Sequence, residues 1–440
     1  MFDFSRSAAG RFLGALGAFP SALLRPLARG KARSAGGWFP HQWFLAVGAA
    51  GMFCVPHSAW NNVYGVLFAA AALALYWWDC AALERRARNP ALLGGGVWIF
   101  LLMCLLCTLW AHFRAASLRV AIFYWTGFVL AYLAAVSFPR PEDLRRLAGL
   151  LYAALIVTAV YGLLVYFTGR ETYGAVVGDA VYARLASTLE HGINYSEFAA
   201  MLLPVAVVWA ARTPDRRRRW VLLFLLLLPL AALLLTYART GWIAAGLSAL
   251  VLLWVLDKRL LIPAAALGIA GFFLLPEGLQ GRFLSMLQFN DTGSSGRFTL
   301  WRECFSMLRR HWLLGVGLGP ENFYRAYLPH ATGLLPFQPP HANMGYLEIF
   351  LSLGVAGFLA FVSFFFGVFP RLRRAAQRLP EKKDRWSVYA LTASLAGGAL
   401  ANLPEHLWFY PRVLFLWCLL YGLALGLTGE IENTENIHRR

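Results

Sequence analysis

Charged residues are scarce in this chain of 440 residues: 14% are Asp, Glu, Lys or Arg, whereas 59% are hydrophobic. A soluble domain of this length would need far more polar side chains to cover a core made from so many apolar residues. The composition therefore excludes a soluble globular protein. It predicts an integral membrane protein whose apolar surface lies in lipid.

Cysteine and metal-binding patterns are also scarce. Of six cysteines, only Cys304 lies away from the apolar stretches, so no disulfide framework is expected. Cys104 and Cys107 form a CxxC pair inside an apolar run, where packing explains the spacing better than metal or redox chemistry. The sequence also contains no HExxH motif and no P-loop. We therefore expect neither a metal nor a cofactor.

Long apolar runs are abundant. Twelve stretches approach the roughly 20 residues that a helix needs to cross a bilayer. We therefore predict an all-α polytopic membrane protein of about twelve transmembrane helices, in which residues 1–440 form a single transmembrane domain. The stretches lie at 43–57, 63–83, 92–112, 118–138, 148–167, 194–211, 220–238, 240–256, 259–275, 344–369, 386–403 and 408–427.

The basic residues predict the orientation. With twelve spans and a cytoplasmic amino terminus, 28 of the 40 Lys and Arg fall in cytoplasmic segments, and the 12 on the other side are all Arg. This charge is spread over seven cytoplasmic segments rather than one patch, so we predict membrane lipids and no nucleic acid as partners. Residues 1–42 lack the apolar region and cleavage site of a signal peptide, and we predict that they form a retained cytoplasmic basic arm.

Two substantial connections lie on the predicted outer side, at about 168–193 and 276–343. The second is a large loop inserted between spans 9 and 10. It contains a stretch in which aromatic and aliphatic residues recur at helical spacing, which predicts a surface helix that Ser294 or Ser295 would cap. The residues of this apolar stripe are Phe298, Trp301, Phe305, Leu308 and Trp312.

Arginines in these connections are candidates for binding an anion. Arg239, in TYARTGW, lies between two apolar spans, where its charge is costly unless it is paired. It is either an interfacial arginine that reaches the lipid headgroups or a ligand for an anion. Arg297 is expected at the start of the surface helix, where the helix dipole disfavours a cation and a bound anion would compensate. Arg184 and Arg302 lie in the same two connections.

His341 is the candidate for chemistry. It follows two prolines and immediately precedes an apolar span, so we expect it at the outer membrane boundary, where its near-neutral pKa suits proton transfer. Glu348, seven residues later, is expected on the same helix face, where it would orient the histidine or pair with an outer arginine. Rival histidines with weaker context are His191, His311, His330 and His406. Arginines beside a histidine at a membrane surface suggest chemistry on a phosphate-bearing lipid.

Four features together resemble the superfamily of O-antigen ligases and O-antigen polymerases. They are SLGVAG after His341, the arginine of TYARTGW between two spans, the arginine of SGRFTLW followed by GVGLG, and a long outer loop between late spans. The resemblance covers most of 180–360. It implies a fold like that of the type C glycosyltransferases and a substrate that is a glycan linked to undecaprenyl diphosphate, at the periplasmic face of the bacterial inner membrane.

The ligase branch of this superfamily moves the glycan onto the lipid A-core acceptor of lipopolysaccharide. The resemblance implies Arg239 and Arg297 as diphosphate contacts, Arg184 and Arg302 as further participants, and His341 as the residue nearest the chemistry. His341 would remove the proton of the acceptor hydroxyl, giving metal-independent transfer with inversion at the anomeric carbon.

Two alternatives stay open. O-antigen polymerases and protein O-oligosaccharyltransferases use the same donor and share much of this pattern. A transporter of lipid-linked sugars would also use arginines, but it should carry charges at mid-span and paired halves. The sequence shows few such charges and no evident repeat.

Overall fold

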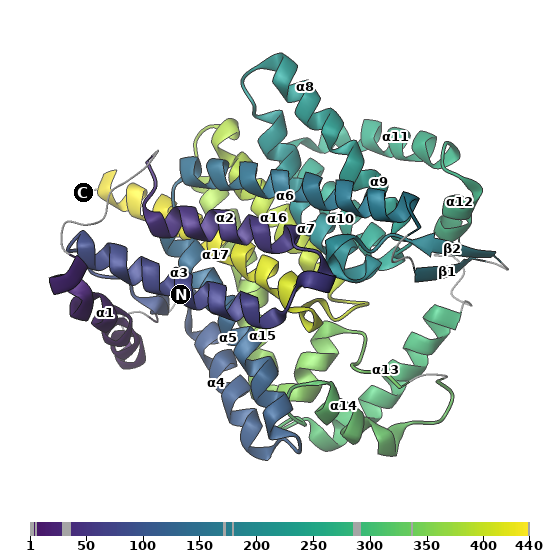
Figure 1. The fold of residues 1–440 in the computed structure, drawn as a ribbon, viewed down its shortest axis with the longest axis horizontal. Helices are drawn as coiled ribbons and strands as arrows, with labels where there is room; N and C mark the ends of the chain where they lie inside the picture. Colours follow the sequence, from purple (N-terminus) through teal and green to yellow (C-terminus); the bar gives the residue numbers. More distant parts are fainter. Residues whose placement is uncertain are drawn as a thin grey trace.

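The computed structural model is built almost entirely from helices, as Figure 1 shows. It describes residue 4 and residues 7–28, 37–169, 173–177, 180–284, 292–335 and 338–438. The all-α prediction is confirmed for these residues except at one short hairpin in the first outer connection. There β1 (Tyr173–Val177) pairs with β2 (Ala180–Arg184) in antiparallel register, with Tyr173 opposite Arg184.

The helices follow the apolar runs. In the first half of the chain they are α1 (Ala8–Ala28), α2 (Pro40–Cys54), α3 (Asn62–Ala82), α4 (Gly95–Trp110), α5 (Arg114–Ser137), α6 (Pro141–Phe167) and α7 (Gly192–Ala211). Those that follow are α8 (Arg216–Leu225), α9 (Leu227–Leu235), α10 (Arg239–Asp257), α11 (Leu261–Phe273), α12 (Glu277–Leu284), α13 (Thr292–His311), α14 (Pro320–Tyr327), α15 (Gly345–Arg378), α16 (Trp386–Ala401) and α17 (Pro411–His438). A 3-10 turn, η8 (Leu407–Phe409), separates the last two.

Each of the twelve predicted stretches contains a helix, but these helices differ in their capacity to cross a membrane. Within the described residues, 7 helices are long and apolar enough to span, with α8 and α9 counted as one. Two others, α4 and α16, are apolar but have 16 residues each. The structure therefore supports a multi-pass membrane protein, while the count of twelve spans stays a prediction.

The predicted basic arm contains a helix that the charge pattern did not indicate. Helix α1 packs against α3, and Asn89 donates a hydrogen bond to the carbonyl of Gly10 at 2.9 Å. Its large apolar side chains recur at helical spacing and are exposed. Such a face suits the boundary between headgroups and acyl chains. The side chains are Phe12, Leu16, Phe19 and Leu23.

Close backbone contacts hold the central helices together. Helix α17 lies along α5, and α16 lies between α7 and α10. A Cβ atom added at Gly422 would stand 2.0 Å from the carbonyl oxygen of Ala131, and one added at Gly426 would stand 2.5 Å from that of Ala135. Only glycine therefore permits this approach. The tight packing fixes the positions of the connections that these helices carry.

The predicted surface helix is present as α13, at the lower right of Figure 1. It begins at Thr292, so the serines predicted to cap it, Ser294 and Ser295, lie within the helix. Its predicted apolar stripe is only partly covered: Phe298, Phe305 and Trp312 are exposed, while Trp301 and Leu308 are half-buried. The buried face lies to one side of this stripe and packs on α14 and α15. Its residues are Leu300, Glu303, Cys304 and Met307.

The two glycine motifs of the sequence contact each other. Gly354 interrupts α15 with φ 67° and ψ −171°, a conformation that favours glycine. The kink leaves the carbonyl oxygens of Leu351 and Ser352 free to accept hydrogen bonds from the backbone N–H groups of Val316 at 2.8 Å and Gly317 at 3.0 Å. SLGVAG and GVGLG therefore form one structural unit that fixes the carboxyl-terminal end of α13 against α15.

Candidate active site

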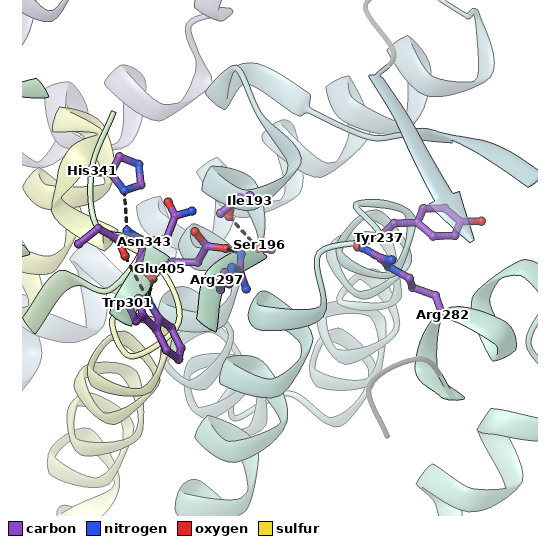
Figure 2. A network of polar contacts seen from close by, with 10 residues as sticks. Ile193, Ser196, Tyr237, Arg282, Arg297, Trp301, His341, Asn343 and Glu405 are labelled. Atoms are coloured by element: carbon purple, nitrogen blue, oxygen red, sulfur yellow. Dashed lines mark hydrogen bonds and ion pairs between the residues drawn. The ribbon is translucent and has the colours of Figure 1, made fainter. Parts of the chain in front are cut away.

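An ion pair between distant segments marks the centre of the site. Arg297 of α13 contacts the carboxylate of Glu405, which lies in the connection between α16 and α17. The Glu405 side chain is 8% exposed and that of Arg297 is 27% exposed, so the pair is largely removed from solvent. In Figure 2 this pair lies between Ser196 of α7 and the segment that carries His341.

Two further groups converge on the same carboxylate. Burial raises the pKa of Glu405, and the charges of Arg297 and then Arg184, with a hydrogen bond from Thr240, oppose that effect. Arg184, at the end of β2, also donates from its Nε to the carbonyl oxygen of Thr236 at 2.8 Å. Two guanidinium groups therefore act on one carboxylate, Arg297 through direct contact and Arg184 through its charge.

Arg239 is the first residue of α10 and is half-buried. It directly precedes Thr240, so the turn that carries it also contacts Glu405. The structure thus brings three of the predicted arginines, Arg184, Arg239 and Arg297, into the elements around one carboxylate.

His341 lies beside this ion pair. Its side chain is buried, and its ring is 4.5 Å from that of Phe409 and 5.4 Å from that of His406, measured between centroids. Its Nδ1 accepts a hydrogen bond of 3.1 Å from the backbone N–H of Asn343. Burial, and then the charge of Arg297, lower the pKa of His341 to about 4. The ring is therefore neutral at pH 7, with its proton on Nε2.

Hydrogen bonds to the backbone fix the positions of these connections relative to one another. The N–H of Gly345 donates to the carbonyl oxygens of Asn402 and Glu405 at 2.9 and 2.8 Å, which ties the start of α15 to the connection that follows α16. A Cβ atom at Gly345 would stand 1.9 Å from the Asn402 side chain, so this approach requires glycine. Trp301 donates from its Nε1 to the carbonyl oxygen of Ala342 at 3.1 Å, which ties α13 to the residue after His341.

Glu348 stabilises the His341 segment through the backbone. Its Oε2 accepts a 2.8 Å hydrogen bond from the N–H of Ala342, and its Oε1 accepts one of 3.3 Å from Ser352. The expected shared helix face is wrong, because α15 begins at Gly345, so His341 lies before the helix and Glu348 in its first turn. These hydrogen bonds position the backbone next to His341 and do not charge-balance an arginine.

Arg302 is placed differently from the other predicted arginines. Its side chain is exposed on α13, next to Glu303, whose carboxylate faces Tyr327 and Thr332. The expected position of Arg297 at the helix start is wrong, because α13 begins five residues earlier, at Thr292. The dipole acts mainly within the first turn, so Glu405 and not the helix end compensates this arginine.

Unusual backbone conformations lie in the same connections, and unpaired polar atoms lie there and in the first turns of α7. Four non-glycine residues with positive φ, at 48–74°, lie there: Ser187, Glu190, Tyr237 and Asn343. Such conformations cost free energy and cluster at functional sites. Within the described part of the chain, several buried atoms also lack hydrogen-bond partners. They include Asn194 Oδ1, Glu197 Oε2, and both ring nitrogens of His406.

Sequence reasoning missed Glu405 and undervalued His406. Both lie in a short connection, NLPEHLWFY, between two apolar runs. The signal was an acid next to a histidine on the predicted outer side. No group of three or more His, Cys, Asp or Glu suited to a metal occurs among the described residues.

The second half of the chain is similar to one known family. Residues 222–362 match the family model described as O-antigen ligase. This segment holds Arg239, Arg297, His341 and both glycine motifs, and the match confirms the resemblance predicted from them. No curated protein matches the sequence.

Solved structures are also similar at the level of the chain trace. One of them comes from a study of the "Structural coordination of polymerization and crosslinking by a peptidoglycan synthase complex". The identity is 19%, the TM-score is 0.44, and the alignment covers 77% of this chain and 97% of that one. At this level of similarity it carries no argument about function.

Proposed function

We propose that this chain, which contains an O-antigen ligase domain at residues 222–362, transfers a glycan from undecaprenyl diphosphate to the lipid A-core acceptor. The reaction would take place at the periplasmic face of the bacterial inner membrane. The protein would be an O-antigen ligase that acts without a metal and inverts the anomeric carbon.

The observation that carries the proposal is the convergence of Arg184 and Arg297 on Glu405 beside His341. A single carboxylate balances only one of the two arginines, so positive charge remains for a second anion. In a partly buried site a guanidinium binds phosphate oxygens with two parallel hydrogen bonds. A lipid-linked diphosphate satisfies that geometry and charge.

The arrangement also suits the leaving step. As the bond between the anomeric carbon and the diphosphate breaks, negative charge develops on the departing oxygen. Preorganised donors in a dry site stabilise that charge more in the transition state than in the ground state. We propose this role for Arg184, Arg239 and Arg297, which come from three different outer segments.

We propose that His341 acts at the leaving oxygen. Because its Nδ1 already accepts from Asn343, the neutral ring offers the Nε2–H as a donor. The general-base role expected from the sequence would require His341 to release Asn343 first. A neutral donor next to Arg297 supports charge on a departing diphosphate without adding a second buried cation.

The test is the identity of the acceptor. Purified protein in lipid nanodiscs is incubated with the undecaprenyl-diphosphate glycan, either alone or with lipid A-core. We expect glycan transfer to lipid A-core and no growth of the donor without it. Longer glycans on the donor alone would instead identify a polymerase, and movement of the donor across a bilayer without any new bond would identify a transporter.

The matched variants are Arg297→Ala and Arg217→Ala. Arg217 is exposed at the start of α8, in a segment predicted to be cytoplasmic. We expect transfer to fall only in the first variant. Equal loss in both would show a general effect of basic charge and would contradict a diphosphate site at Glu405.

A further inference from the structure

A cavity of about 160 Å³ lies beside the arginine cluster. It is bounded by α5, by the glycine motif after α13, by the kinked part of α15 and by the connection before α17. His406 and Phe409 line this cavity and also contact the ring of His341, so they separate it from the arginine cluster. Other lining residues are Arg119, Tyr124, Glu348 and Trp408.

The walls combine aromatic faces with polar groups. Tyr124 and Trp408 supply rings, while Asn62 and Glu348 supply hydrogen-bonding groups. Sugars present apolar C–H faces and hydroxyl groups, and sites for them combine aromatic and polar side chains in this way. The size and lining of the cavity therefore suit one ring of a carbohydrate.

His406 is the unexplained group in this wall. Its side chain is 7% exposed, and neither ring nitrogen has a hydrogen-bond partner among the described residues. Leaving a buried polar group unpaired costs on the order of 1–3 kcal/mol. A hydroxyl group bound in the cavity would remove that cost. His341, by contrast, already uses its Nδ1.

We propose that this cavity binds the sugar of the acceptor and that His406 accepts the proton of the attacking hydroxyl. The inference rests on the proposed function, because it requires transfer to a hydroxyl group. The hydroxyl oxygen forms a bond to the anomeric carbon, and its proton moves to a ring nitrogen of His406. The bond from that carbon to the diphosphate breaks, and its electron pair leaves with the diphosphate oxygen.

The two histidines then have different tasks. His406 faces the acceptor and takes a proton, whereas His341 faces the arginines and donates to the leaving group. The two histidine rings are neighbours at 5.4 Å, and Phe409 packs against both, at 6.0 Å from His406 and 4.5 Å from His341, measured between centroids.

The experiment uses the full chain in nanodiscs with lipid-linked glycan donor and with whichever acceptor the wild type uses. We expect His406→Ala to lower kcat by roughly 10²–10⁴, as for a lost acid–base group, while the affinity for undecaprenyl diphosphate stays unchanged. Added imidazole should restore part of the activity of His406→Ala. The matched control is His112→Gln, since His112 is exposed before α5 and lines no part of the cavity.

A second variant tests the cavity itself. Val120 lines it from α5 and is half-buried, so Val120→Trp should narrow the cavity without breaking the core. We expect a rise in the KM for the acceptor of roughly tenfold, about 1.4 kcal/mol, and no change for the donor. An unchanged acceptor KM would overturn the assignment of the cavity.

Three other outcomes separate the inference from the proposed function. Wild-type turnover in His406→Ala, or a loss of donor affinity equal to that of Arg297→Ala, overturns the role of His406. Growth of the donor glycan alone overturns the ligase proposal and leaves the test of His406 intact, because a polymerase also needs a base for its acceptor hydroxyl. No transfer by the wild type to any acceptor overturns both.

Discussion

Arginines occur at two kinds of position in this protein. Arg297 and Arg184 are partly buried, and their guanidinium groups face Glu405 and a backbone carbonyl. Arg216 and Arg217 are exposed at the start of α8, where Asp215 caps the helix by accepting from backbone N–H groups. The exposed group belongs to the charge pattern from which we predict the orientation in the membrane, while the buried group forms the proposed binding site. Sequence composition does not distinguish them.

Burial alone does not define the functional group either. Arg412 is 6% exposed, yet its donors go to backbone carbonyl oxygens, with Thr188 at 2.7 Å and Val55 at 2.8 Å. Backbone carbonyls cannot leave when a ligand arrives, so Arg412 is a structural residue. A carboxylate partner such as Glu405 can share or yield its arginine to a competing anion.

The largest expected contrast concerns the side of the membrane. A reporter that is active only in the periplasm should work when fused near residue 290 and fail when fused near 215 or 378. The physical reason is the retention of basic segments in the cytoplasm, since 212–219 and 371–385 hold 12 of the 28 cations assigned there. Activity at 378 would reject the twelve-span orientation.

His341 should show the next largest effect. We expect His341→Ala to lower kcat about 10²–10³-fold, as for the loss of one donor to a developing oxyanion. His341→Gln should retain more activity, because its carboxamide N–H replaces the Nε2 donor. If both variants are equally inactive while donor affinity is preserved, His341 is the general base that its sequence context suggested.

The pH dependence of activity tests whether the His341 ring is neutral in the free enzyme or titrates near its ordinary pKa. With the pKa of His341 lowered to about 4, the ring stays neutral well below the ordinary value of 6.5 and becomes protonated only near pH 4. We therefore expect kcat/KM, which reports the free enzyme, to lose no activity to protonation of His341 between pH 7 and pH 5. A fall near pH 6.5 that disappears in His341→Gln would show that the imidazole titrates normally.

The arginines of the cluster should show a smaller effect than His341. Arg297→Ala and Arg239→Ala each remove charge-assisted hydrogen bonds worth roughly 1.5–3 kcal/mol. We expect turnover to fall by about 10- to 100-fold at near-normal expression. Lys at either position should rescue only partly, because an ammonium group cannot form the paired contact. Full activity of both Lys variants would show that these positions need only a positive charge and not the paired contact of a guanidinium group.

Arg302 should show the smallest effect. It is exposed on α13, whereas Arg297 of the same helix contacts Glu405. We expect Arg302→Ala to change transfer by less than about twofold, within the range typical of surface substitutions, and to leave the donor affinity unchanged. A loss equal to that of Arg297→Ala would indicate that Arg302 also contacts the diphosphate.

Local patterns allowed part of the site to be predicted. His341 after two prolines, Arg239 at a turn between apolar runs, and the periodic stretch of α13 are short-range signals. The only local signal of Glu405 was the histidine next to it, and its significance comes from Arg297, which is 108 residues away in the chain. The separation of Arg302 from the cluster depends on which face of α13 packs, and its apolar stripe did not indicate that face.

The sequence by itself determined that the chain suits a lipid environment, that its fold is helical and on which side the basic residues are in excess. These properties are sums over single residues and do not depend on long-range contacts. The glycine motifs and lone arginines also indicated the resemblance to O-antigen ligases that residues 222–362 show. Only the tertiary structure decided which arginines share a carboxylate, which nitrogen of His341 carries the proton, and that His406 stands unpaired beside a cavity. These properties arise from contacts between α7, α10, α13, α15 and the connection before α17, and such long-range contacts have no local signature in the chain.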